Sequence, residues 1–149
     1  MSEFQLDRFL PFRLNRAAEF VGLGFSGHYR KAYRMTRPEW RVLAALGAYG
    51  RMTATEVGRN STMHKTKVSR AVSALEERRW LKRREDEADR RVEHLELTRD
   101  GRRAYEKIAH EALLYEQKLA ELLGEEGVRA LEAGLAAVER SFGERVEGV

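Results

Sequence analysis

The spacing of the apolar residues changes in the middle of the chain, and this change restricts the folds that it can adopt. Residues 64–78 carry apolar side chains at the 3.6-residue spacing of a helix with one buried face. The positions concerned are Val68, Ala71, Val72 and Leu75. Residues 92–97 instead alternate between apolar and polar, as a half-buried strand does, and residues 81–84 can form its partner. The sequence therefore predicts a helix followed closely by a β-hairpin.

Two further helices are expected before this one, because both have recognisable starts. Thr36 and Glu39 have the spacing of a capping box, in which each side chain bonds the backbone of the other residue. Thr53 and Glu56 repeat that spacing at the start of a shorter helix that ends near Asn60. A short helix, a turn, an amphipathic helix and a hairpin together form a winged helix-turn-helix.

Long helices are expected on both sides of this module. Residues 6–34 have a helical pattern interrupted by glycines, which either bend the helix or allow a close approach. Thr98 caps another long helix, which breaks at Gly124. In the final helix, apolar residues alternate at steps of three and four, as partner helices require; they are Val128, Leu131, Leu135, Val138 and Phe142. This seam fits either an intramolecular core or a helical dimerisation lobe, and the long flanking helices favour the dimer.

The charge distribution points to a polyanionic partner. The chain has a net charge of +4, with +5 in residues 59–103 and −5 in residues 104–149. No acidic residue occurs from Asn60 to Ala74, although a solvated helix normally mixes both signs. With the apolar positions turned inward, the outer face carries hydrogen-bonding or cationic side chains suited to the major groove of DNA. The residues of this face are His64, Lys65, Thr66, Lys67, Ser69, Arg70 and Ser73.

The tip of the expected hairpin offers a second contact. Arg90 and Arg91 lie there, where an arginine can enter a narrow minor groove. Asp89 has no role toward phosphate and is expected to orient a neighbouring arginine through a charge-assisted hydrogen bond. Taken alone, this tip also fits an ordinary solvated turn. Together with the preceding helices it favours double-stranded DNA binding.

These segments resemble the MarR family of bacterial regulators. The resemblance is strongest in residues 36–43, 67–72 and 89–91, followed by the Leu-Thr-x-x-Gly motif at residues 97–101. It implies a mainly α fold with a small β-hairpin wing (α+β). Residues 36–103 would form the winged helix-turn-helix lobe, and residues 1–35 and 104–149 the dimerisation lobe. The resemblance also implies a homodimer on a palindromic operator, with Thr66, Lys67, Ser69 and Arg70 near bases or phosphates and Arg90 in the minor groove.

Two residues depart from the family pattern. Arg79 stands where relatives commonly have glycine, and a non-glycine residue in the left-handed region costs on the order of 1 kcal/mol. His64 stands at the helix cap where Asp or Ser is frequent. Within the family, residues 10–15 and 67–72 resemble the branch that controls catabolism of hydroxycinnamates and related aromatic acids.

The resemblance implies an effector site where the first helix meets the DNA-binding lobe. Arg13 and Arg16 could pair with a carboxylate or phosphate, and Phe20 and Trp40 could enclose an aromatic ring. Alternatively, the aromatic residues belong to the core and the arginines are solvated. The sequence thus predicts a repressor released by a small aromatic acid or its CoA thioester.

Other classes of protein receive little support. Cysteine is absent, and the four histidines lack ligand spacing, so no metal or cofactor is expected. No phosphate loop or nucleophile elbow indicates an enzyme. No apolar run suits a membrane span and no signal pattern opens the chain, so a cytoplasmic protein is expected. The remaining alternative is a dimeric helical protein-interaction module that does not bind DNA.

Overall fold

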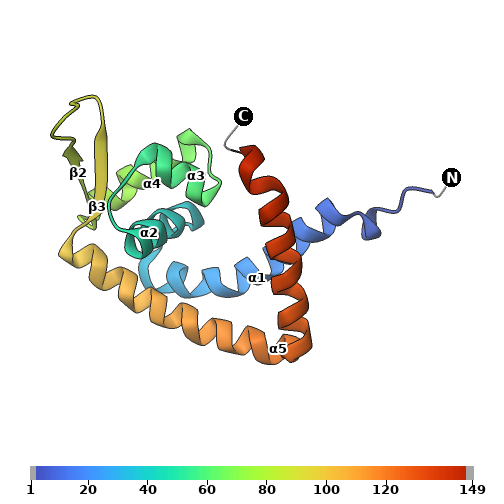
Figure 1. Cartoon of the computed structure of the whole chain (residues 1–149). Helices are drawn as coiled ribbons and strands as arrows, with labels where there is room; N and C mark the ends of the chain where they lie inside the picture. Colours follow the sequence, from blue (N-terminus) through green and yellow to red (C-terminus); the bar gives the residue numbers. More distant parts are fainter. Residues whose placement is uncertain (1–2, 147–149) are drawn as a thin grey trace. The chain divides into compact units, whose positions relative to one another are not determined.

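The computed structural model describes the backbone of residues 3–146 and the side chains of residues 3–143. The chain divides into two compact units, Met1–Glu111 and Ala112–Val149, and Figure 1 shows its elements in order. It is mostly helical with one small antiparallel sheet, which confirms the predicted fold class. The elements are η1 (Leu6–Arg8), α1 (Leu10–Tyr33), α2 (Arg37–Tyr49), β1 (Met52–Thr53), α3 (Ala54–Ser61), α4 (Lys65–Glu77), β2 (Leu81–Glu85), β3 (Glu93–Leu97) and α5 (Arg99–Val146).

The starts of α2 and α3 follow the predicted capping boxes. The amide of Glu39 donates to the Thr36 hydroxyl at 3.3 Å, and the Thr36 amide donates to the Glu39 carboxylate at 2.7 Å. Thr53 and Glu56 make the same reciprocal pair at 3.2 and 3.1 Å. Each pair satisfies two backbone N–H groups that have no acceptor within the first turn of the helix, which is why these helices begin where they do.

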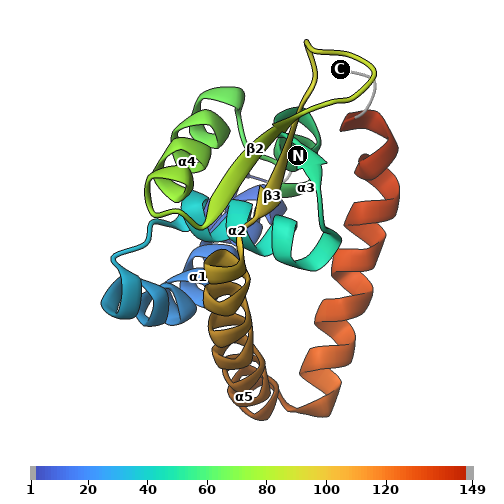
Figure 2. The same cartoon turned by 90° about the vertical axis from the view of Figure 1, so that its left-hand side faces the viewer.

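The hairpin is confirmed and joins a third strand. β2 and β3 pair antiparallel, with Arg83 opposite Leu95, and β1 pairs with the other edge of β3. The strand order is therefore β1-β3-β2. Strand β1 was not predicted because two residues are too short to show a period. Figure 2 shows the loop between β2 and β3 extending away from the helices α2, α3 and α4.

The core of the first unit lies among α2, α3, α4 and the sheet. Leu43, Val57 and Leu75 are fully buried. All four apolar positions predicted to face inward from α4 are buried, at 3% exposure or less. Burying a side chain of this size contributes roughly 1.5–3 kcal/mol. This packing fixes the rotation of α4 about its axis, and so decides which of its residues face outward.

The glycines of α1 do not break it. The helix continues from Leu10 to Tyr33 through Gly22, Gly24 and Gly27. A Cβ at Gly22 would lie 3.5 Å from the Arg37 guanidinium, which is an ordinary van der Waals contact, and a Cβ at Gly27 would meet nothing within 4 Å. A close approach of another group therefore does not require glycine at either of these two positions.

The second unit contains the rest of α5. Gly124 interrupts its helical conformation with φ 77° and ψ 165°, as the sequence predicted for a break at this position. Apolar side chains on both sides of Gly124 are exposed; they include Leu113, Leu122, Leu131, Leu135, Val138 and Phe142. Among residues 3–146, no helix combines the length and apolar character needed to cross a bilayer.

Candidate nucleic-acid interface

The predicted contact face of α4 is exposed. His64, Lys65, Thr66, Lys67, Ser69, Arg70 and Ser73 are all solvent-accessible, while the opposite face of the helix is buried. The surface therefore combines cationic groups with short hydroxyl donors and lacks carboxylates. This is a surface that a major groove can accept, since its base edges offer hydrogen-bond acceptors and its rims carry phosphates.

His64 acts as the cap of α4 despite its weak intrinsic preference. Its Nδ1 accepts a hydrogen bond from the Thr66 amide at 3.3 Å. Because Nδ1 is the acceptor, the neutral ring carries its proton on Nε2. That nitrogen remains a donor at the start of the exposed face.

The connection between α4 and strand β2 of the wing passes through Arg79, which has a strained backbone conformation. Arg79 adopts φ 63°, so the left-handed conformation is kept although the residue is not glycine. The Arg79 carbonyl accepts a hydrogen bond from the Thr98 hydroxyl at 2.6 Å, and the Arg79 amide donates to the backbone carbonyl of Glu76 at 2.9 Å. Surrounding hydrogen bonds thus hold this conformation in place.

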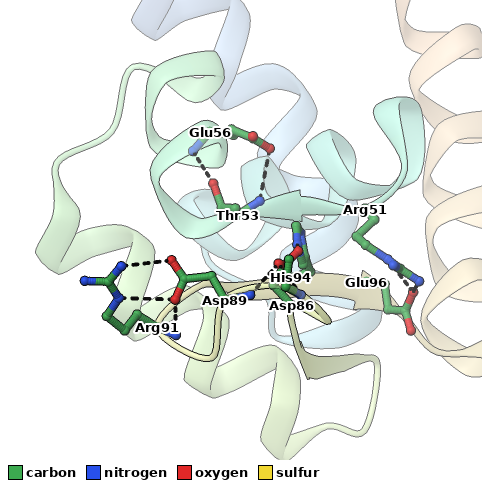
Figure 3. A network of polar contacts seen from close by, with 9 residues as sticks. Arg51, Thr53, Glu56, Asp86, Asp89, Arg91, His94 and Glu96 are labelled. Carbon is green, nitrogen blue, oxygen red and sulfur yellow. Dashed lines mark hydrogen bonds and ion pairs between the residues drawn. The ribbon is translucent and has the colours of Figure 1, made fainter.

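The tip of the wing is ordered by two carboxylates, shown in Figure 3. Asp86 accepts hydrogen bonds from the Ala88 and Asp89 amides, both at 3.0 Å, and contacts His94 Nε2 at 2.8 Å. The contact with His94, followed by the two amide bonds, lowers the pKa of Asp86 below its usual value. Sequence reasoning missed the pairing of Asp86 with His94, eight residues apart, because it depends on the hairpin register.

The prediction that Asp89 orients a neighbouring arginine is confirmed. Its carboxylate accepts hydrogen bonds from Arg91 Nε at 3.2 Å and from Arg91 Nη2 at 3.3 Å. The Arg91 side-chain bond, followed by the Arg91 amide, lowers the pKa of Asp89. The positive charge of Arg91 is therefore largely balanced within the wing.

Most other cations of the wing strands are also balanced. Glu96 lies within 3.1–3.4 Å of Arg51, Lys82 and Arg84. Burial alone would raise the pKa of Glu96, but the Arg51 hydrogen bond and the nearby cations lower it overall. Arg83 pairs with Glu76 and Glu93. In the part of the wing that the structure describes, Arg90 is the exposed arginine without an ion pair, so it carries the unbalanced charge at the tip.

The residues predicted for the effector site contact other side chains rather than one another across α1 and α2. The Trp40 ring contacts Phe25 at 5.6 Å and Tyr29 at 5.9 Å between centroids, whereas Phe20 is 67% exposed. Arg16 lies over the ring of Phe12 and pairs with Asp7 at 3.6 Å, and Arg13 is exposed. Within residues 3–143, no ring contact or hydrogen bond joins Arg13, Arg16 or Phe20 to Trp40.

Known proteins resemble the chain in both sequence and fold. The MarR family model matches residues 35–92, which span α2 to the end of the wing loop. YwoH of Bacillus subtilis (strain 168), an HTH-type transcriptional regulator, is 27% identical over 114 residues, covering 76% of this chain and 82% of YwoH.

Two solved structures extend the likeness over nearly the whole chain. The MarR family regulator SPO1453 from Silicibacter pomeroyi DSS-3 is 28% identical, with a TM-score of 0.77 over 91% of this chain and 98% of its own. BpsR of Bordetella bronchiseptica, whose DNA binding is regulated by 6-hydroxynicotinic acid, has a TM-score of 0.81 at 22% identity, over 93% and 98% of the two chains. Residues 35–92 are thus similar in sequence to the MarR family of transcriptional regulators, and nearly the whole chain shares the fold of solved MarR family regulators.

Proposed function

We propose that the chain is a DNA-binding transcriptional regulator of the MarR type that binds a palindromic double-stranded operator as a homodimer. We further propose that it is a repressor released by a small aromatic acid or its CoA thioester. The observation that carries the DNA-binding part lies in the first unit. The exposed, carboxylate-free face of α4 and the unpaired Arg90 belong to the same compact body. A cytoplasmic location accompanies this function, because the DNA lies there.

The roles proposed for the contact residues follow from their chemistry. Arg70 is suited to bidentate recognition of guanine, and Ser69 and Thr66 to single hydrogen bonds with base edges or phosphates. Lys67 offers a point charge for phosphate. Arg90 would enter the adjacent minor groove, while Asp89 and Arg91 hold the tip in shape.

The homodimer is supported by apolar side chains that a single chain leaves uncovered. In the second unit, Leu122 is 85% exposed and Phe142 is 56% exposed. The N-terminal segment likewise leaves Phe4 and Leu10 exposed, at 70% and 65%. A soluble monomer seldom leaves many large apolar residues in water, so a partner copy is the natural cover. A two-fold axis would then present two wings at half-sites about 34–36 Å apart.

We place the proposed effector site where α1 meets α2. Phe25, Tyr29 and Trp40 provide an aromatic wall, and Arg13 and Arg16 provide positive charge along the exposed face of α1. Phe20 would supply a second ring for the ligand. The ligand would release DNA only if it binds more tightly to a form with a different half-site spacing. That BpsR responds to an aromatic acid supports this ligand class, and hydroxycinnamates are the first compounds to test.

Selection of bound sequences from a random DNA pool tests the function directly. We expect an inverted repeat, because two identical subunits related by a two-fold axis read the same half-site twice. Binding should also weaken steeply with salt as counterions return to the phosphates. Isothermal titration and gel shift with hydroxycinnamates and their CoA thioesters then test the effector. A pool that yields no enriched sequence would contradict the DNA-binding proposal.

The second candidate, a helical protein-interaction module, is favoured by the same uncovered apolar residues. It predicts oligomers but no sequence preference in DNA. Arg70→Ala separates the two functions, since it should relax the selected sequence if α4 reads bases, and should have no effect if the module binds only protein.

A further inference from the structure

A polar cleft of about 650 Å³ lies beside the start of α4. Its walls come from α1, from the first turns of α2 and from the turn that precedes α4. The charged and titratable residues that line it are Glu19, Arg30, Arg37, Arg41, His64 and Lys67. All of them belong to the first unit. Four cations and one carboxylate therefore share one hollow next to the predicted DNA-binding face.

The positive charges of this cleft are only partly balanced. Arg37 donates to the two oxygens of Glu19 at 3.2 and 3.5 Å, and this hydrogen bond is the main reason that the pKa of Arg37 is raised. Arg30, Arg41 and Lys67 have no carboxylate partner among the residues whose side chains are described. Three cations held close together repel each other, and an anion bound between them would relieve that repulsion.

The position of the cleft beside α4 points to a phosphate of the DNA backbone as the anion that it binds. Lys67 and His64 line the cleft and also belong to the exposed face of α4. A helix with its side chains is about 10–12 Å across and the major groove about 12 Å wide, so the phosphates of both strands flank an inserted helix. A cationic hollow beside the start of α4 would therefore face one of these backbones.

We propose that Arg30, Arg41 and Lys67 seat a phosphate group of the DNA backbone in this cleft. The proposal rests on the DNA binding proposed above and adds residues of α1 and α2 to the interface. A phosphate contact of this kind fixes the register and tilt of α4 in the groove without reading sequence. Glu19 holds Arg37 at the edge of the cleft and reduces its total positive charge.

The test measures DNA affinity of the full-length protein against salt concentration, by fluorescence anisotropy, on a selected operator and on a random duplex. Because the homodimer carries each substitution in both subunits, Arg30→Gln and Arg41→Gln should each lower the slope of log K against log salt by about 1.8, which is about 0.9 for each of two contacts. That change in slope corresponds to roughly sixtyfold weaker binding at 0.1 M salt, by about the same factor on both duplexes. Glu19→Gln should act in the opposite direction and tighten binding, a gain that misfolding cannot produce.

Arg140→Gln is the matched control, because it removes the same charge from an exposed position of the second unit. It should leave the salt slope unchanged. Unchanged slopes and affinities for both Arg30→Gln and Arg41→Gln would overturn the phosphate site. That result would leave the proposed function intact as long as wild type binds the operator and Arg70→Ala loses preference for it. Absence of DNA binding by wild type would instead reject the function itself.

Discussion

Asp89 holds Arg91 with both of its carboxylate oxygens, at 3.2 and 3.3 Å, and accepts a third hydrogen bond from the Arg91 amide at 3.0 Å. The neighbouring Arg90 is exposed and outside this pair. Two adjacent arginines thus have different electrostatic surroundings. One stabilises the wing, and the other remains available to a partner.

This difference predicts unequal effects on DNA binding. Arg90→Gln should weaken operator binding by on the order of 1 kcal/mol, because it removes an unbalanced charge at the tip. Arg91→Gln should reduce the free energy of operator binding by less, since the charge of Arg91 is already paired with Asp89. Anisotropy titrations on operators with A·T-rich and G·C-rich flanks would measure both variants. An equal loss in the two variants would contradict the assignment of Arg90 to the minor groove.

The left-handed residue at the end of α4 predicts a stabilising substitution. Arg79→Gly should be more stable than Arg79→Ala by about 1 kcal/mol, because only glycine adopts φ 63° without a Cβ penalty. Both variants lose the same side chain, so the comparison isolates the backbone effect. Urea unfolding followed by circular dichroism would give the difference. Equal stabilities would show that the backbone changes conformation when Arg79 is replaced.

The packing of Gly101 against Trp80 predicts a destabilising substitution. A Cβ at Gly101 would collide with the Trp80 carbonyl, the group that accepts the Thr98 amide at 2.9 Å. Gly101→Ala should therefore cost about 1–3 kcal/mol by forcing the start of α5 away from that carbonyl. Gly27→Ala is the control, since a Cβ there meets nothing within 4 Å. It should instead stabilise α1 by about 0.5–1 kcal/mol, and thermal unfolding would compare the two.

The exposed seam of α5 predicts a variant that cannot dimerise. Leu131→Asp places a charge on a side chain that is 43% exposed in one chain and would be buried in a dimer. We expect a folded monomer by analytical ultracentrifugation, with operator affinity reduced because two half-sites are no longer bound together. Ala137→Asp adds the same charge on another side of the helix and should remain dimeric. A Leu131→Asp protein that sediments as a dimer would place the interface elsewhere.

The wing tip should respond to acid through Asp86. Contact with His94 and with the amides of Asp89 and Ala88 lowers the pKa of Asp86 in the folded protein below its unfolded value. The stabilisation is therefore fully present above the ordinary Asp pKa of about 3.9 and is lost as the pH falls through the lower folded value. NMR shifts of the Ala88 and Asp89 amides should titrate with a midpoint below that ordinary value. Asp86→Ala should show the loosened tip already at neutral pH.

The sequence alone predicts the structural features that depend on residues close together in the chain. The capping boxes of Thr36 and Thr53, the buried positions of α4 and the pairing of Asp89 with Arg91 all join residues at most a few positions apart. Their geometry follows from the helical period or from one turn, so the residue order is sufficient to predict them. The exposed face of α4 follows in the same way once its buried positions are known.

Features that join distant segments needed the packed molecule. Strand β1 exists because Met52 reaches Leu95, and Trp40 contacts Phe25 and Tyr29 instead of Phe20 because packing sets the rotation of α1 against α2. The cationic cleft brings Arg30 and Arg41 to Lys67 from three helices. A periodic pattern reports which face of a helix is buried, but not the relative rotation and offset of two helices. Those depend on how their side chains interlock, which is a property of the folded core.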